Sequence, residues 1–345
     1  MRITRMITNN PNNCMRISIM QMTRITSNCA PCAKATGQAN VETRIARIIR
    51  ALILSAGLGN RLKPMTDFIP KPLLPIVDRP VIDINISRLL EFGIENIGFN
   101  LFYKPNMIKK LLEKIMDNAY IVTEDKLKGT GGALLNFQEF LKGDFIIHNC
   151  DIITNIDLKE AIEFHKHHRP FATLVLTKKS GTNFVEINGD FQIKRFSENE
   201  SKDFYTFTGC AILSGKIFSY LLNKETFSMI EVYQKLIDHN EPILGIPIQG
   251  TWYDIGTHKR YWQVHHDILN KKVKFKEVKI NSQQYIHPTS NVQTKNLSGF
   301  ISIGENCFIS DTVTLNNTVV FNNSRILEGN FNNCLLSDKF CIKMS

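Results

Sequence analysis

The sequence lacks several features that would place it in a special class of protein. Its longest apolar runs, such as residues 51–54, fall far short of the roughly 18–20 residues that span a bilayer, which excludes a transmembrane helix. Its eight cysteines in 345 residues show no framework spacing and follow no secretory segment. They predict mostly reduced thiols in a cytoplasmic protein. Hydrophobic residues at 43% and charged residues at 21% exclude wholesale disorder, collagen and coiled coil.

Negative charge is scarce only at the start of the chain. Residues 1–50 carry eight Lys or Arg against a single acid, Glu42, so they hold +7 of the net charge of +10. The rest is nearly balanced, and we expect no nucleic-acid partner for it. Residues 1–46 show no sustained period and predict a disordered basic extension, with a targeting segment or a nucleic-acid-binding tail as alternatives. Cys29 and Cys32 lack a second pair for zinc.

Residues 47–275 predict one α/β domain. Short apolar runs that predict strands alternate with segments of helical period, and this alternation favours a Rossmann-like mixed, mostly parallel sheet flanked by helices. The predicted strands are 48–55, 97–101, 120–123, 145–148, 172–176, 184–187, 191–196 and 207–213, with a hairpin turn at 188–190. The predicted helices are 81–92, 107–116, 132–141, 158–165, 216–222, 229–239 and 261–270.

Residues 281–345 follow a different period. Every sixth residue from position 297 is apolar in six of seven cases, while the positions between are rich in Ser, Asn, Thr and Gly. A period of six is typical of a parallel β-helix with one inward apolar residue per face, and about three coils fit here. The predicted inward positions are Leu297, Ile303, Ile309, Leu315, Phe321, Leu327 and Asn333. The alternative is a chance run of loop residues.

A glycine loop follows the first predicted strand, at residues 55–62. Gly57 and Gly59 would let backbone N–H groups approach phosphate oxygens. The loop has Leu62 where a dinucleotide fingerprint needs its third glycine, and it lacks the P-loop lysine. It has instead Arg61, an always-charged side chain suited to bidentate phosphate contact. The alternative is a structural turn.

Three further side chains lie in settings that suit phosphate chemistry. Lys71 stands between two prolines, which favours a rigid phosphate contact over a solvated loop lysine. Asp151 ends an apolar strand, where ligands of open α/β sheets lie, and could hold Mg²⁺ against a triphosphate or merely cap a turn. Asp254 has a similar strand-to-turn setting, so the two aspartates could share one metal ion.

Together and in this order, these segments resemble the sugar-1-phosphate nucleotidylyltransferases. This family includes mannose-1-phosphate guanylyltransferases, glucose-1-phosphate thymidylyl- and uridylyltransferases, and N-acetylmuramate-1-phosphate uridylyltransferases. The resemblance covers about residues 50–269 and rests on ALILSAGLGNRLKPMT (51–66), PKPLLPI (70–76), GTGGAL (129–134), HNCDI (148–152), FTGCAIL (207–213) and WYDIGT (252–257). It implies a fold of the nucleotide-diphospho-sugar transferase type, and the terminal hexads resemble the left-handed β-helix of several members.

The resemblance implies a role for each matched residue. The catalytic residues would be Arg61, Lys71 and Asp151, and Mg²⁺ would be held by Asp151 and Asp254. The nucleotide would be bound by Ala56, Gly57, Gly59, Glu124, Gly129, Thr130 and Gly131. The sugar would be bound by Asn149, Glu198 and Gly209.

The resemblance predicts that a nucleoside triphosphate and a sugar 1-phosphate form a nucleotide sugar and pyrophosphate. We favour mannose 1-phosphate with GTP, and the alternative is a uridylyl- or thymidylyltransferase for a glucose or N-acetylmuramate 1-phosphate. Asn199 replaces a lysine that contacts the sugar phosphate in many members. A non-catalytic regulator, a nicotinamide oxidoreductase and an acyltransferase are the other classes considered. We expect no membrane partner, and we expect the β-helix to support a homo-oligomer or to act as a cap.

Other conspicuous residues are interpreted as structural. The clusters 165–168 and 265–266 contain adjacent histidines without an acidic or cysteine partner, which predicts solvated helix faces. Trp252 and Cys150 are interpreted as packing residues.

Overall fold

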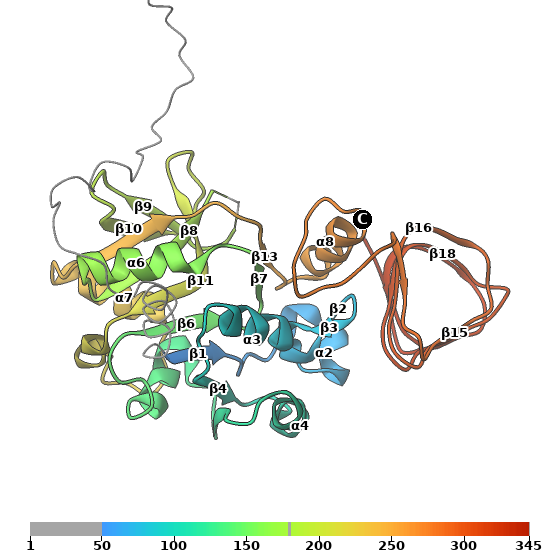
Figure 1. Cartoon of the computed structure of the whole chain (residues 1–345), viewed down its shortest axis with the longest axis horizontal. Coiled ribbons are helices and arrows are strands. Elements are labelled where there is room, and N and C mark those ends of the chain that lie inside the picture. Colours follow the sequence, from blue (N-terminus) through green and yellow to red (C-terminus); the bar gives the residue numbers. More distant parts are fainter. Residues whose placement is uncertain (1–49, 179–180, 345) are drawn as a thin grey trace, which may run out of the picture. The chain divides into compact units, whose positions relative to one another are not determined.

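A computed structural model of the chain describes residues 50–178 and 181–344, and the extension with Cys29 and Cys32 lies outside them. At the centre, β1 (Arg50–Leu54) pairs in parallel with β4 (Ile97–Leu101) and with β6 (Phe145–Asn149) (Figure 1). The strand β5 (Tyr120–Thr123) extends this parallel half beyond β4. The carboxyl ends of these four strands therefore meet at one edge of the sheet.

The other half of the sheet is largely antiparallel. The long strand β11 (Tyr205–Leu213) runs antiparallel to β6, β8 (Ala172–Thr177) and β9 (Phe184–Ile187). A hairpin joins β9 to β10 (Ile193–Ser197), and β12 (Ile243–Pro247) pairs in parallel with β8. The mixed sheet is confirmed. Parallel pairing predominates only in the first half, because the chain after residue 177 returns through hairpin and antiparallel connections.

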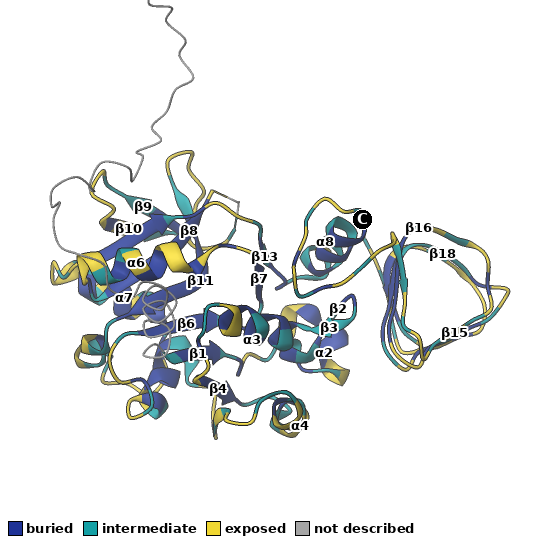
Figure 2. Ribbon diagram, in the orientation of Figure 1, coloured by how far each residue is buried: buried dark blue, intermediate teal, exposed yellow. Residues whose placement is uncertain are grey.

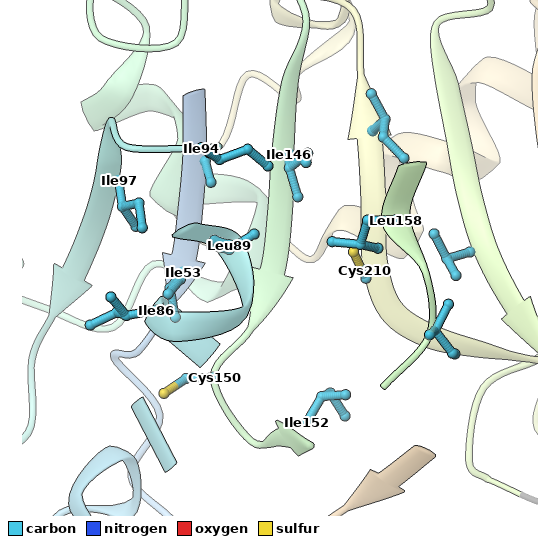
Figure 3. Packing of buried hydrophobic residues seen from close by; sticks show 14 of the residues in the cluster. Ile53, Ile86, Leu89, Ile94, Ile97, Ile146, Cys150, Ile152, Leu158 and Cys210 are labelled. Atoms are coloured by element: carbon cyan, nitrogen blue, oxygen red, sulfur yellow. The ribbon is translucent and has the colours of Figure 1, made fainter. Parts of the chain in front are cut away.

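Five helices match the predicted helical segments: α3 (Val81–Glu91), α4 (Pro105–Ile115), α6 (Leu158–His168), α7 (Met229–Asp238) and α8 (His258–Leu269). Apolar residues of α3, such as Ile86 and Leu89, pack against Ile53 of β1 and Ile146 of β6 (Figure 3). Most strands of the sheet are buried, the edge strands β5 and β10 are partly exposed, and the helices expose only one side (Figure 2). The core therefore lies between sheet and helices.

Two predicted helices are wrong in type. Residues 132–141 form the end of α5 (Gly129–Gly132) and the 3-10 helix η3 (Ala133–Phe137). Two adjacent glycines disfavour a longer α-helix there. Residues 216–222 fall on a second 3-10 helix, η4 (Gly215–Tyr220). The remaining short elements are η1 (Asn60–Leu62), α2 (Met65–Phe68), η2 (Lys71–Leu73), β2 (Pro75–Ile76) and β3 (Arg79–Pro80).

A two-stranded ribbon brings two distant segments together. The strand β7 (Ile152–Thr154) directly follows Asp151, and it pairs antiparallel with β13 (Trp252–Asp254). The N–H of Ile255 donates to the carbonyl oxygen of Asp151 at 3.0 Å. This ribbon therefore places the backbone of Asp254 beside that of Asp151, about one hundred residues earlier in the chain.

The C-terminal region consists of stacked parallel strands. One sheet contains β14 (Gln284–Ile286), β16 (Leu297–Ile303), β18 (Thr314–Val320) and β20 (Asn330–Leu336), closed by the antiparallel β21 (Cys341–Lys343). A second sheet contains β15 (Asn291–Val292), β17 (Phe308–Ile309) and β19 (Arg325–Ile326). We call this region the C-terminal coil.

The predicted period of six holds for part of the C-terminal coil. Ile303, Ile309, Leu315 and Phe321 are buried, as predicted. Leu327 is 53% exposed and Asn333 is also exposed, so the prediction is wrong at these two positions. Ile309 pairs with Ile326, and Thr318 pairs with Cys334. The repeat therefore shortens below 18 residues, and Ile326 and Cys334 take the inward positions instead.

Asparagines form the corners of the C-terminal coil. Asn317 and Asn333 have φ values of 46° and 47°, a left-handed conformation that asparagine tolerates better than most residues. The Asn317 side chain accepts a hydrogen bond from the N–H of Phe300 at 3.2 Å and donates to Asn333 Oδ1 at 3.0 Å. The backbone carbonyl oxygen of Asn317 accepts a hydrogen bond from Trp262 Nε1 at 3.0 Å. The C-terminal coil is thus hydrogen-bonded to α8.

Candidate functional site

A cavity of about 360 Å³ opens at the edge where the parallel strands end. It is bordered by loops that follow β1 and β6, by the region of η1 and η2, and by the start of α5. Among the predicted site residues it is lined by Ala56, Gly57, Gly59, Arg61, Lys71, Gly129, Thr130, Asn149 and Asp151. These residues come from segments far apart in the sequence. They meet because the carboxyl ends of the parallel strands lie at the same edge of the sheet.

In the first glycine segment, residues 55–62, Gly59 is packed against the protein, whereas Gly57 borders open space. Gly59 has a φ of +68°, which favours glycine, and Thr66 Oγ1 donates to its carbonyl oxygen at 3.0 Å. A Cβ at Gly59 would lie 2.7 Å from Thr66 Cγ2. A Cβ at Gly57 would meet nothing within 4 Å, although Gly57 lines the cavity. The missing side chain of Gly57 therefore leaves room for a ligand.

The second glycine segment, residues 129–132, is packed against the chain before α7. A Cβ at Gly129 would lie 2.5 Å from the carbonyl oxygen of Phe227, and one at Gly131 would lie 2.9 Å from that of Ser228. The N–H of Gly131 donates to the Phe227 oxygen at 2.9 Å, and Thr130 Oγ1 accepts from the N–H of Met229 at 2.9 Å. These glycines are therefore required for packing. Gly131 does not border the cavity.

An ion pair lies across the cavity. Lys71 Nζ is 2.5 Å from Asp151 Oδ2, and the two side chains are 13% and 26% exposed. Lys71 begins η2 between two prolines, which fix its backbone. The backbone before Asp151 is fixed as well, because Asn85 Nδ2 donates to the Cys150 carbonyl oxygen at 2.9 Å. The pair thus combines a cation and a carboxylate on rigid supports.

Arg61 and Asp254 meet at Gly256, which also lines the cavity. A Cβ at Gly256 would lie 2.8 Å from Arg61 Nη2 and 2.7 Å from Asp254 Oδ1. Asp254 Oδ1 accepts from the N–H of Gly256 at 2.6 Å, and Asp254 Oδ2 is 2.7 Å from Arg260 Nη1. Asp254 is buried and does not itself line the cavity. Its carboxylate is held by α8 at the edge of the site.

A buried hydrogen-bonded chain that the sequence did not predict runs beneath the cavity. Asn100 Oδ1 accepts from the N–H of Ser55 at 2.8 Å, and Asn100 Nδ2 donates to Glu124 Oε1 at 2.8 Å. Glu124 Oε2 accepts from the N–H of Lys128 at 3.2 Å. Asn100 lines the cavity, whereas Glu124 is 5% exposed and does not. A polar residue in the otherwise apolar strand 97–101 was the signal that could have revealed it.

Only two of the three predicted sugar-binding residues lie together. Asn149 lines the cavity, and a Cβ at Gly209 would lie 2.7 Å from Asn149 Nδ2, so these two positions touch. Gly209 has a φ of +81° and interrupts the register between β11 and β8. Glu198 is exposed in the bend after β10 and does not border the cavity. The structure therefore brings together two of the three.

Several titratable groups near the site are unsuited to chemistry at neutral pH. Burial lowers the pKa of His148 to about 4 and raises the pKa of the Cys150 thiol to about 12. Cys150 and Trp252 are buried, as predicted, and Trp252 Nε1 donates to the Thr208 carbonyl oxygen at 2.9 Å. An acid, base or thiol nucleophile at these positions is therefore not expected.

The prediction of solvated histidine clusters is wrong at two positions. His165 is 2% exposed and its Nδ1 lies 2.8 Å from Thr173 Oγ1. His265 is fully buried, and its Nε2 lies 3.1 Å from the Pro75 carbonyl oxygen. Both lie on the inner faces of their helices, where spacing of three and four residues places them among apolar neighbours.

The residues present fit a magnesium ion that is shared with a phosphate ligand. Asp151 and Asp254 are two carboxylates from adjacent backbone segments, and Mg²⁺ is usually bound through one or two carboxylates plus substrate phosphates and water. In the described part of the chain, no group of three or more His, Cys, Asp or Glu could hold a metal ion alone. The donor set thus suits an ion that arrives with a triphosphate.

Comparisons with known proteins agree with this geometry. The nucleotidyl transferase family profile matches residues 50–271. A mannose-1-phosphate guanyltransferase of Eremothecium gossypii is 30% identical, with 76% of this chain and 73% of that protein covered. A UTP–glucose-1-phosphate uridylyltransferase of Synechocystis is 25% identical, with 81% of this chain and 85% of that protein covered. The two relatives carry names with different bases and sugars.

Solved structures show the same fold. A UDP-glucose pyrophosphorylase complexed with UDP-glucose matches with a TM-score of 0.56 and 19% identity, and 65% of this chain and 99% of that one are covered. HddC from Yersinia pseudotuberculosis, complexed with GMP-PN, matches with a TM-score of 0.55 and 24% identity over 64% and 99% of the two chains. The family match covers more than half of the chain. The chain therefore belongs to the nucleotidyl transferase family, as an enzyme whose named relatives are sugar-1-phosphate nucleotidyltransferases.

Proposed function

We propose that this protein joins a nucleoside triphosphate to a sugar 1-phosphate, with release of pyrophosphate. The observation that carries the proposal is the Lys71–Asp151 pair, which lies across a glycine-lined cavity that Arg61 also borders. Two cations and a carboxylate border a cavity in which phosphates can approach backbone N–H groups. This arrangement suits a triphosphate that reacts with a second anion. The proposal rests also on the named relatives.

The reaction needs no nucleophile from the protein. A phosphate oxygen of the sugar 1-phosphate attacks the α-phosphorus of the triphosphate and forms a new P–O bond. The bond from the α-phosphorus to the bridging oxygen of the β-phosphate breaks, and pyrophosphate leaves with the electron pair. Because both reactants are anions, catalysis must come from in-line positioning and from neutralised charge.

Arg61 and Lys71 supply the neutralising charge in this proposal. Arg61 lies against Gly256 in the lining of the cavity and can contact two phosphate oxygens at once. Lys71 is paired with Asp151, and this pair holds its ammonium group in the site. Gly57 leaves space for the phosphates to approach the backbone. Preorganised charges of this kind stabilise a transition state without reorganisation.

Asp151 and Asp254 would hold Mg²⁺ together with phosphate oxygens of the substrate. When bound, the ion supplies further neutralisation of the reacting phosphates. Arg260 holds Asp254 at 2.7 Å and fixes the direction of its carboxylate. The protein thus keeps each carboxylate paired with a cation of its own, which limits their mutual repulsion.

The nucleotide and sugar contacts follow from the lining of the cavity. We propose that Ala56, Gly129 and Thr130 border the nucleoside, with Gly131 packed behind them. Glu124 would act through Asn100, because both of its carboxylate oxygens are already hydrogen-bonded. Asn149 and Gly209 would border the sugar, and Glu198 would join them only if the bend after β10 approaches a bound substrate.

Mannose 1-phosphate with GTP is the substrate pair that we propose first. Its support is the guanyltransferase group of relatives at about 30% identity. The alternative is a uridylyl- or thymidylyltransferase for a glucose or N-acetylmuramate 1-phosphate. Within it, the Synechocystis relative supports UTP with glucose 1-phosphate. We also propose residues 1–46, 47–275 and 281–345 as the functional divisions of the chain. The C-terminal coil would form a left-handed β-helix that supports a homo-oligomer.

A pyrophosphate-release assay tests the proposal. Five nucleoside triphosphates are crossed with a panel of sugar 1-phosphates in the presence of Mg²⁺. Release with one pair, and its loss in Lys71→Met but not in the exposed control Lys159→Met, supports the reaction. Absence of release with every pair, together with a nucleotide sugar that still raises the melting temperature, would favour a non-catalytic regulator instead.

A further inference from the structure

A second pocket, of about 480 Å³, opens at the opposite edge of the central sheet. Asp144 borders this pocket and immediately precedes β6, whereas Asn149 at the other end of β6 borders the catalytic cavity. A strand rises about 3.3 Å per residue, so the two sites are separated by roughly 16 Å of β6. The pocket is therefore distinct from the site described above. It is lined by Asp144, His165, Lys166, Arg169, Pro170, Ser214 and Lys216.

The lining of this pocket is strongly positive. The lining contains three cations, Lys166, Arg169 and Lys216, and one carboxylate, that of Asp144, and the carboxylate of Glu163 also acts on Lys166. Within residues 50–178 and 181–344, none of these three cations has an ion-pair partner within 4.0 Å. Burial lowers the pKa of Lys166, and Asp144 only partly offsets this effect. Three cations brought together without enough negative charge are stabilised by a bound anion.

The backbone that carries these side chains is held by hydrogen bonds. Arg169 ends α6 with a φ of +50°, and its N–H donates to the His165 carbonyl oxygen at 2.8 Å. A left-handed residue commonly ends an α-helix, and here it sets the direction in which the chain leaves α6. His165 is fixed through Thr173, and its Nε2 lies 3.9 Å from Asp144 Oδ1, beyond direct hydrogen-bond length.

The helix dipole explains only part of this arrangement. Cations at the C-terminus of α6 are favourable there in any case, which accounts for Lys166 and Arg169. Lys216 comes from η4, a separate element that follows β11. Its convergence on the same pocket has no explanation in the dipole of α6. The backbone beneath is fixed, because the N–H of Ser214 donates to the Phe171 carbonyl oxygen at 2.9 Å.

We propose that this pocket binds a small phosphorylated molecule, at a site separate from catalysis. Lys and Arg side chains form charge-assisted hydrogen bonds with phosphate oxygens, and the pocket has the size of a small-molecule site. Lys166, Arg169 and Lys216 contact the phosphate, and His165 lies at the wall. This proposal goes beyond the transfer reaction and does not depend on it.

Equilibrium dialysis of the full chain with labelled pyrophosphate, without divalent metal, tests the proposal. The wild type is expected to bind two pyrophosphates per chain, one at each site. The double variant Lys166→Met/Lys216→Met is expected to lose one of them, and its kcat/KM is expected to stay within about twofold of the wild type. Lys159→Met, an exposed lysine on the same helix, is the matched control and keeps both.

A second background separates the two sites. Arg61→Met/Lys71→Met removes cations of the catalytic cavity, and one pyrophosphate is expected to remain bound. Adding Lys166→Met and Lys216→Met to that background is expected to abolish binding or to weaken it at least about tenfold for each charge removed. Absence of bound pyrophosphate in Arg61→Met/Lys71→Met would overturn the proposal. So would a second bound pyrophosphate that survives in Lys166→Met/Lys216→Met.

Discussion

The two glycine segments of the cavity look alike in sequence and differ in what their glycines do. In residues 55–62, a Cβ at Gly57 would meet nothing within 4 Å, and both Gly57 and Arg61 line the cavity. In residues 129–132, the glycines lie against the backbone of Phe227 and Ser228. Gly57 is small so that a ligand can approach, whereas Gly129 and Gly131 are small so that the protein can pack. A glycine motif alone therefore does not identify ligand contacts.

The largest expected effect is on the rate, in the first segment. Arg61→Met removes a preorganised cation without removing buried apolar area, because Arg61 is exposed. We expect kcat to fall about 10²–10³-fold. The melting temperature should stay within about 1 °C of the wild type, since exposed substitutions have small effects on stability. Steady-state kinetics and calorimetry on the same preparation measure both. An unchanged kcat would contradict the role of Arg61.

The largest expected effect on stability is in the second segment. Gly131→Ala places a Cβ against the Phe227 ring and 2.9 Å from the Ser228 carbonyl oxygen. We expect the free energy of unfolding to fall by about 2–3 kcal/mol because of overpacking. Urea denaturation measures it. Gly189→Ala, in a turn where a Cβ meets nothing within 4 Å, is the control. Wild-type stability of Gly131→Ala would remove the contrast between the two segments.

The hydrogen-bonded chain from Ser55 to Lys128 links the two segments, and its removal should disturb both. In Glu124→Gln, the new amide group faces the donors of Asn100 and Lys128, so one of these hydrogen bonds is lost. We expect KM for the triphosphate to rise about tenfold. The preference between bases, measured as a ratio of kcat/KM, should not change. A changed preference would show that Glu124 itself contacts the base.

A smaller effect is expected at Gly57, where the added group is a single methyl. Gly57→Ala occupies space in the cavity and nothing else. We expect KM for the triphosphate to rise several-fold, while the free energy of unfolding stays within about 0.5 kcal/mol. Titration of the nucleotide and urea denaturation measure the two quantities. A loss of stability as large as that of Gly131→Ala would mean that both segments serve packing.

The unfolding of Gly131→Ala and Gly57→Ala by acid should differ in the same direction. Burial lowers the folded-state pKa of His148 and His265 to about 4, below the unfolded value of 6.5. Between pH 6.5 and 4 the unfolded state therefore binds more protons. The free energy of unfolding then falls as pH falls, by up to about 1.4 kcal/mol per unit for each histidine. Gly131→Ala should reach its unfolding midpoint at a higher pH than Gly57→Ala. Equal acid midpoints would contradict the assignment of packing to the second segment.

The sequence predicted those features that depend on local pattern. Strands 97–101 and 120–123 have the predicted bounds, because a short apolar run between turn residues defines a strand. Arg61, Lys71 and Asp151 were predicted from their neighbours, and all three line one cavity. Each of these predictions rests on residues close in sequence, together with the rule that ligands lie at the carboxyl ends of parallel strands.

Features that depend on contacts between distant segments were not predicted. The packing of Gly131 requires Phe227, and the hydrogen bond from Asn100 requires Glu124 on another strand. The burial of His265 depends on Pro75, almost two hundred residues earlier. At Leu327, loss of a single residue from one repeat moved the inward position to Ile326. Such changes follow from tertiary register, which a period in the sequence only approximates.

Phosphorus NMR is the most direct test of the proposed transfer from a nucleoside triphosphate to a sugar 1-phosphate, because it identifies the bonds that form and break. One triphosphate and one sugar 1-phosphate that react in the release assay are incubated with the protein and Mg²⁺. We predict a nucleotide sugar and pyrophosphate in equal amounts. We also predict no product above background with Asp151→Asn, and full product with Asp157→Asn, a helix-capping control on α6. Product formation by Asp151→Asn at the wild-type rate, or release of inorganic phosphate instead of pyrophosphate, would contradict the proposed reaction.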